Sequence, residues 1–103
     1  MSAPLIPAGV VIPDLYAAEG QGEAALVYAH LVHPLTEWHW YVLEVSREDE
    51  DRIFALVDGW ALELSYASLA ELEANGVKTD ADWQPRPLSE VRRDCELRHV
   101  FLD

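Results

Sequence analysis

The chain contains four histidines and nineteen acidic residues, the side chains that most often hold metal ions or move protons in proteins. His30 and His33 are three residues apart in an apolar run, and on a β-strand this spacing places two side chains on opposite faces. His39 stands between two tryptophans, and His99 is far from it in the sequence. Neither an H-E-x-x-H motif nor a second cysteine is present. The sequence therefore predicts no metal site and no cofactor.

Three carboxylates come from neighbouring segments that are expected to be strands. Glu44 and Asp58 lie near the two ends of a predicted hairpin, and Glu63 follows on the next strand. Two carboxylates that meet across a sheet can share one proton, an arrangement that serves acid–base catalysis. In a chain with nineteen acids, chance proximity explains such a pair better. We therefore expect a protein that is not an enzyme.

Motifs for nucleophilic catalysis and phosphate binding are also missing. Cys95, the only cysteine, falls on the apolar stripe of a predicted helix with Leu88 and Val91, as core residues do. The stretch 19–23, EGQGE, has no lysine, precedes a predicted strand and brings two carboxylates, which would repel a phosphate. A single cysteine permits no disulfide within the chain, and we expect a cytoplasmic protein.

Net charge is the strongest signal in the composition. The formal charge is −12, and residues 1–77 hold thirteen acids and two bases, Arg47 and Arg52, for a net of −11. Between these arginines stand four consecutive acids, from Glu48 to Asp51. Such a chain repels nucleic acid and anionic membranes and attracts basic proteins.

The elements that would carry these residues are predicted from hydrophobic periodicity. Strands are expected over 24–32, 37–45, 52–59 and 60–66, with 46–51 as a hairpin loop. In the second strand, alternation places one set of side chains on one face and a second set on the other. The first set is Trp38, Trp40 and Val42; the second is His39, Tyr41, Leu43 and Val45.

Aromatic side chains concentrate on these predicted strands. A platform for stacking nucleic-acid bases would need basic neighbours, and no Lys or Arg precedes Arg47. We expect instead that the aromatics form core on one face and a protein-binding patch on the other, because Trp and Tyr commonly anchor such patches. The residues are Trp38, Trp40, Tyr41 and Trp60.

Two helices are expected after the strands. Ser68 and Glu71 form a capping box for the first helix, and Asn75-Gly76 is a typical helix end. The second helix is expected over 88–97 with Ser89 as its cap, and residues 98–103 suit either helix or strand. The predicted fold is α+β, an antiparallel sheet of three to four strands with one or two short helices packed on one face.

The amino-terminal residues are predicted to stand outside this domain. Residues 1–12 form an extended arm rich in proline and glycine, and 13–103 form a single α+β domain. The arm is apolar but has no basic residue and is broken by prolines, unlike a signal peptide or a membrane span.

Four segments give the chain a resemblance to a known family. They are PDLYAAEGQGE (13–23), WHWYVLEV (38–45), LELSYASLAELE (62–73) and WQPRPLSEV (83–91). In this order they resemble the bacterial domain-of-unknown-function family 2958, whose members are often encoded on plasmids and other mobile elements. Ser65 stands where that family usually has a glycine. The resemblance implies a mobile-element context and no catalytic role.

Size, charge and this context together are similar to those of anti-CRISPR and other DNA-mimic inhibitors. We therefore expect a non-enzymatic protein that occupies the basic surface of a nucleic-acid-binding protein or a CRISPR effector complex. Two alternatives are an accessory scaffold or dimerisation domain of a mobile element, and a carboxylate-dependent enzyme. The candidate partner-binding residues are Glu44, Glu48, Asp49, Glu50, Asp51, Asp58 and Glu63.

Overall fold

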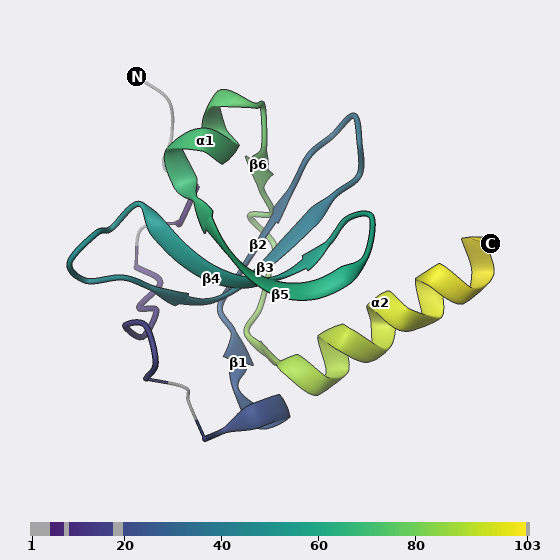
Figure 1. The fold of residues 1–103 in the computed structure, drawn as a ribbon, viewed down its shortest axis with the longest axis horizontal. Coiled ribbons are helices and arrows are strands. Elements are labelled where there is room, and N and C mark those ends of the chain that lie inside the picture. Colours follow the sequence, from purple (N-terminus) through teal and green to yellow (C-terminus); the bar gives the residue numbers. More distant parts are fainter. Residues whose placement is uncertain (1–4, 8, 18–19, 103) are drawn as a thin grey trace.

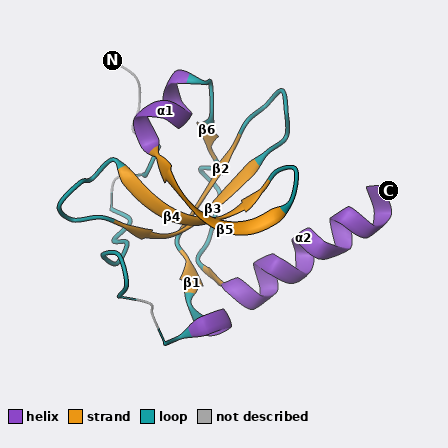
Figure 2. Ribbon diagram, viewed as in Figure 1, coloured by secondary structure: helices purple, strands orange, loops and turns teal. Residues whose placement is uncertain are grey.

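The computed structural model describes residues 5–7, 9–17 and 20–102 and confirms the predicted α+β class (Figures 1 and 2). The elements, in chain order, are a short 3₁₀ helix η1 (Gly22–Ala24), β1 (Leu26–Val27), β2 (Ala29–Val32), β3 (His39–Val45), β4 (Arg52–Asp58), β5 (Leu62–Ser68), α1 (Leu69–Ala74), β6 (Lys78–Thr79), β7 (Arg86–Pro87) and α2 (Leu88–Leu102). No helix in the described ranges has both the length and the hydropathy needed to cross a membrane.

The main sheet is antiparallel and has five strands in the order β5-β4-β3-β2-β6. It exceeds the expected three to four strands because the two-residue strand β6 pairs with the outer edge of β2. The hairpin of β3 and β4 occupies its centre, and its loop at 46–51 lies where the sequence predicts it. A second sheet of two short strands joins β1 to β7.

The prediction of a single strand over 24–32 is wrong, because this segment divides into three elements. Residues 22–24 form η1, β1 pairs with β7, and β2 pairs with β3 and β6. Tyr28 lies between the two strands, and its N–H donates to the carbonyl of Val42 at 2.9 Å. An apolar run without alternation cannot reveal that the chain passes from one sheet to another, because both parts are buried.

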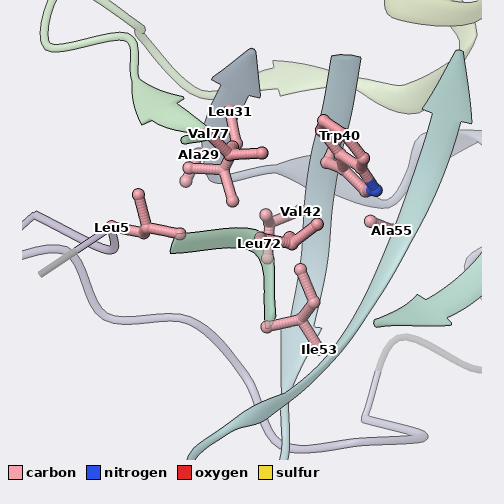
Figure 3. Packing of buried hydrophobic residues seen from close by; sticks show 9 residues of the cluster. All are labelled: Leu5, Ala29, Leu31, Trp40, Val42, Ile53, Ala55, Leu72 and Val77. Carbon is pink, nitrogen blue, oxygen red and sulfur yellow. The ribbon is translucent and has the colours of Figure 1, made fainter. Parts of the chain in front are cut away.

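Both faces of the main sheet are covered. One face, which we call the α1 face, packs against α1 and the amino-terminal segment (Figure 3). Its buried cluster is Leu5, Ala29, Leu31, Trp40, Val42, Ile53, Ala55, Leu72 and Val77. The other, the α2 face, packs against α2. Its buried cluster is Ala25, Val27, Tyr41, Leu43, Leu56, Leu88, Val91 and Cys95.

The two helices therefore lie on opposite faces, and the expectation of helices on one face is wrong in this respect. The reason is that β3 and β4 are apolar on both sides, so each side needs its own cover. Leu5 is buried and Ile12 is partly buried against the α1 face, so these parts of the predicted arm pack on the core.

A β-bulge changes the side-chain order near the end of β3. Val42 pairs with Ala55 and Glu44 pairs with Phe54, which leaves Leu43 as the extra residue. After the bulge, Val45 packs against the α1 face, and its predicted place beside Tyr41 is wrong. One inserted residue reverses the alternation beyond it.

The helix ends follow the sequence signals in α1 more closely than in α2. The Ser68 hydroxyl accepts from the Glu71 N–H at 3.3 Å. Helix α1 ends at Ala74 with Asn75 as its C-cap, followed by Gly76, whose φ is +90°. These features confirm the predicted cap and stop. Helix α2 begins at Leu88, one residue before its expected cap Ser89. It continues to Leu102, so most of the ambiguous segment 98–103 is helical.

Substitution of Gly59 by Ala tests the packing at the β4–β5 turn. A Cβ at Gly59 would lie 2.5 Å from a carbon of the Trp38 ring. We expect Gly59→Ala to lower the free energy of unfolding by about 1–3 kcal/mol, the usual cost of overpacking, as measured by urea denaturation. In a Trp38→Ala background this cost should largely disappear. An equal cost in both backgrounds would contradict the assigned contact.

Candidate functional site

The hairpin loop between β3 and β4 holds most of the predicted partner-binding acids. Its backbone is closed by its own hydrogen bonds: the Arg52 N–H donates to the carbonyl of Asp49 at 2.9 Å, and the Asp49 N–H donates to the Ser46 hydroxyl at 3.0 Å. Glu48, Asp49 and Glu50 are exposed. The loop therefore presents these three carboxylates from a hydrogen-bonded frame.

Asp51 has a different role from its three neighbours. Its carboxylate accepts from the Ala70 N–H at 2.6 Å and from the Ser68 hydroxyl, and its carbonyl accepts from the Leu69 N–H at 2.8 Å. The Ser68 hydrogen bond, followed by that from Ala70, lowers the pKa of Asp51 below its ordinary value. Asp51 thus joins the hairpin loop to the first turn of α1.

This link brings further carboxylates to the loop. One concavity is lined by Glu50 and Asp51 from the loop and by Glu73 from α1. Glu71 is exposed on the first turn of α1. We call the exposed set the acidic end: Glu48, Asp49, Glu50, Glu71 and Glu73.

The acidic end has little basic compensation. None of its carboxylates forms an ion pair with a basic side chain of the described residues. Arg47 is the one basic residue among those described that line the concavity. The ion pairs on the described part of the chain involve Arg86, Arg92, Arg98, His30 and His99. Glu71 and Glu73 are not among the acids predicted from the sequence, because only the contact through Asp51 places them near the loop.

The other three predicted acids lie elsewhere. Glu44 and Asp58 are 5% and 6% exposed, on the α2 face, and Glu63 is exposed on β5. Glu44 pairs with Phe54 and Asp58 pairs with His39, so these two acids are separated by four residues of β4, about 13 Å at the usual strand rise. Glu63 is opposite Val57, whose side chain packs on the α1 face. The three carboxylates do not come together as a proton-sharing pair.

Asp58 instead fixes the carboxyl-terminal half of α2. Its two carboxylate oxygens accept from Arg98 Nη2 at 2.8 Å and from His99 Nε2 at 2.6 Å. The same Arg98 nitrogen donates to the Tyr41 hydroxyl at 3.1 Å. A buried carboxylate with two cationic or polar donors is well satisfied, so Asp58 has a structural role.

A chain of hydrogen bonds continues from Arg98 across the α2 face. His30 Nδ1 lies 2.9 Å from Asp80 Oδ2, His30 Nε2 lies 2.8 Å from His39 Nδ1, and Arg98 Nη1 lies 3.5 Å from His39 Nε2. Because Asp80 only accepts and Arg98 only donates, each histidine must donate through Nδ1 and accept through Nε2. His33 is not part of this chain, and its Nε2 bonds the Asn75 carbonyl.

The His30 ring stacks on Tyr41 and meets Trp83 at a tilt of 51°, and burial disfavours the charged forms of His39 and Tyr41. The His30 ring centroid is 4.7 Å from that of Tyr41 and 5.2 Å from that of Trp83. Burial, with the nearby positive charge of Arg98, lowers the pKa of His39 to about 4, and burial raises the pKa of Tyr41 to about 12. Both are neutral at pH 7.

Burial raises the pKa of the Cys95 thiol, which disfavours the reactive thiolate. Within the described residues, no group of three or more His, Cys, Asp or Glu side chains is arranged to hold a metal ion. No local sequence signal reveals this network, because Asp80 and Arg98 are 50 and 59 residues away from their histidine partners.

The aromatic residues divide between core and surface. Trp40 is buried, whereas Trp60 is 92% exposed and makes a T-shaped ring contact with the half-buried Trp38, at a centroid distance of 5.9 Å. Leu64 and Tyr66, both nearly half exposed, follow on β5, which is the outermost strand of the main sheet. An exposed strand edge with apolar side chains is a typical surface for pairing with another chain.

No protein-family model, no curated protein and no solved structure matches this chain. The resemblance to family 2958 therefore stays a prediction. The function has to be argued from the residues of this chain.

The neutral His39 predicts a specific pH dependence of stability. Its folded pKa of about 4 is below the unfolded value near 6.5, so the unfolded chain binds more protons between these values. Stability should fall as the pH falls from about 6.5 to about 4. In urea denaturation at a series of pH values, His39→Gln should show a shallower decline across this window. His33→Gln is the control outside the network and should retain the decline, and identical slopes for wild type and His39→Gln would contradict the assignment.

Proposed function

We propose that this protein is a non-enzymatic, acidic binding protein from a mobile element that inhibits a nucleic-acid-binding defence complex of the CRISPR type by occupying its basic surface. The observation that carries the proposal is the acidic end, where five exposed carboxylates have no ion pair among the described residues. A nucleic acid presents the same kind of surface, a row of negative charges without internal compensation.

The backbone segments that carry these carboxylates are joined to each other, which supports docking. Asp51 ties the hairpin loop to α1, so the carboxylates of both elements are held in one arrangement before a partner arrives. Pre-organised charges lose less conformational entropy on binding than flexible ones do. A partner that grips phosphates with Lys and Arg would release its anions on docking and would be attracted over a distance by the net charge of −12.

The hydrogen-bond network on the α2 face supports a function other than catalysis. The buried acid Asp58 and the histidines His30 and His39 are engaged in a continuous hydrogen-bond network that couples α2 to the sheet. These hydrogen bonds stabilise the packing of α2 on the sheet, and this structural role explains the three side chains without a substrate.

Self-association is a second candidate function, and the edge strand β5 favours it. If a second copy pairs antiparallel with β5 about Ser65, Leu64 lies opposite Tyr66 of the second copy, and Glu63 lies opposite Ala67. This register makes an apolar cross-strand pair twice and places no like charges directly opposite. The protein would then act as a scaffold or dimerisation domain of the mobile element.

A charge-neutralised loop tests the inhibitory function. The triple variant Glu48→Gln, Asp49→Asn, Glu50→Gln should associate with a CRISPR effector complex about tenfold more slowly at low salt, measured by surface plasmon resonance with a DNA-binding assay in parallel. Asp51 is left intact because it anchors α1. Binding should also weaken as salt rises.

The control carries the same change in net charge away from the acidic end, as Glu37→Gln, Asp82→Asn, Glu96→Gln. It should associate much faster than the loop triple. Equal slowing by both triples would show that only net charge matters and would remove the loop from the site. Binding that leaves target-DNA binding by the effector intact would contradict mimicry.

Self-association predicts the opposite response to salt. Two copies with a net charge of −12 repel each other, so a dimer should become more stable as salt rises. Sedimentation equilibrium should show this trend, and Trp60→Ala should shift the protein toward monomer with its circular dichroism unchanged. A monomer at all salt concentrations would exclude this second function.

A further inference from the structure

The concavity beside the acidic end has an apolar floor. Its volume is about 490 Å³, within the range of about 300–1,000 Å³ that is usual for ligand sites. The hairpin loop, α1 and the amino-terminal segment surround it, and these three lie on the side of the molecule away from α2 in Figure 1. The floor consists of the large apolar side chains of the lining: Leu5, Ile6, Val10, Ile12, Val45 and Leu69. Such a space can hold a large side chain of another protein.

Hydrogen bonds between the walls fix the shape of the concavity. The Val45 N–H donates to the carbonyl of Pro13 at 3.0 Å, which ties the amino-terminal segment to the end of β3. The Arg47 N–H donates to Asp14 Oδ1 at 2.9 Å and ties the same segment to the hairpin loop. Asp51 joins this loop to α1. A preformed site loses less conformational entropy on binding than a site that must first be assembled.

The part of an occupant that reaches the floor has to be apolar. The Asp51 carboxylate accepts from the Ser68 hydroxyl and from the Ala70 N–H. The Ser46 hydroxyl accepts from the Asp49 N–H. These polar groups are already engaged in the protein's own hydrogen bonds, and the floor offers a polar occupant no partner in exchange for its water. A large apolar side chain instead removes its own surface and that of the floor from water, which favours binding.

The charges around the floor favour a basic neighbourhood for that side chain. Glu50 and Glu73 are exposed, and neither forms an ion pair with the described basic residues. With Asp51, they give the described lining three acids against one base, Arg47. Lys or Arg residues on either side of the apolar side chain would therefore be attracted to the edge of the concavity.

A second copy of this chain fits the concavity less well than a basic protein does. Each copy carries exposed apolar side chains, such as Trp60 and Leu35, that could enter the floor of another copy. Each copy also has a net charge of −12, and docking would bring that charge to a lining that is itself acidic. Like charges repel, so charge complementarity favours a basic protein as the occupant.

We propose that this concavity binds a large apolar side chain that a basic protein presents between lysine or arginine residues. The apolar side chain packs on the floor, and the flanking cations pair with Glu50 and Glu73 at its edge. The proposal rests on the proposed function, because it gives the partner that docks at the acidic end a second contact. The charges of the acidic end speed up association, and the side chain in the concavity slows dissociation.

Titration of the whole protein with three peptides, followed by ¹H–¹³C NMR of its methyl groups, tests the site. Acetyl-RKFRK-amide carries both features, acetyl-RKSRK-amide keeps the charge without the apolar side chain, and acetyl-SQFQS-amide keeps the apolar side chain without the charge. The first peptide should shift the methyl signals of Val10, Ile12, Val45 and Leu69, with a dissociation constant of roughly millimolar magnitude for so short a ligand. The other two peptides should bind about tenfold more weakly or less.

The variants identify the groups responsible. Ala70→Trp fills the concavity from an exposed position of α1 and should abolish binding of the first peptide. Ala74→Trp is the matched control, because Ala74 is exposed on the same helix outside the described lining, and it should bind as the wild type does. Glu50→Gln combined with Glu73→Gln should weaken the first peptide about tenfold and leave acetyl-SQFQS-amide unchanged. The comparison of the three peptides uses the unaltered protein, so it remains decisive if Ala70→Trp does not fold.

The outcomes separate this site from docking at the acidic end. No binding of the first peptide, equal methyl shifts with the serine peptide, or full binding by Ala70→Trp would overturn the site. Methyl shifts on concentrating the protein alone would show that a second copy fills the concavity, and would overturn it too. These titrations contain no effector complex, so their failure leaves the proposed function standing. Conversely, an effector complex that does not bind this protein would end the proposed function, while the peptide result would stand.

Discussion

The central hairpin of β3 and β4 is apolar on both faces, and the arrangement of the rest of the chain follows from this constraint. Val42, Ile53 and Ala55 point to one side, and Leu43 and Leu56 point to the other. Exposure of either apolar face to water is unfavourable, so other segments of the chain must cover both faces of the sheet. Helix α1 and the amino-terminal segment cover one face, and α2 covers the other (Figure 1).

The double cover gives the acidic residues three distinct environments. Asp51 and Asp58 are used internally, the first to join the hairpin loop to α1 and the second to hold α2 through Arg98 and His99. Glu44 lines a cleft because the bulge turns it toward the α2 face. The acids of the acidic end stay in water without basic neighbours at ion-pair distance in the described structure. The net charge of −12 is therefore not spread evenly over the surface. Only the acidic end, whose carboxylates form no ion pair with the described basic residues, supports docking onto a basic partner.

Five of the seven basic residues follow residue 77 in the chain, and the other two, Arg47 and Arg52, flank the hairpin loop. Arg86, Arg92 and Arg98 lie on or next to α2, where each bonds a carboxylate. The hairpin loop and α1 instead carry exposed carboxylates that form no ion pair with the described basic residues. A positively charged partner would therefore approach from the side of the molecule away from α2, where the hairpin loop lies in Figure 1.

The sequence by itself determined the α+β class, the central hairpin with its acidic loop, and the cap and stop of α1, because periodicity and local hydrogen bonds within a few residues fix these features. It also indicated that the apolar stripe of Leu88, Val91 and Cys95 is core. Only the tertiary structure decided that the helices take opposite faces, that Val45 changes side, and that Asp51 reaches Ala70. It also decided that His30, His39 and Asp80 form one network. These features depend on contacts between residues far apart in the chain or on one inserted bulge residue, and neither leaves a local pattern in the sequence.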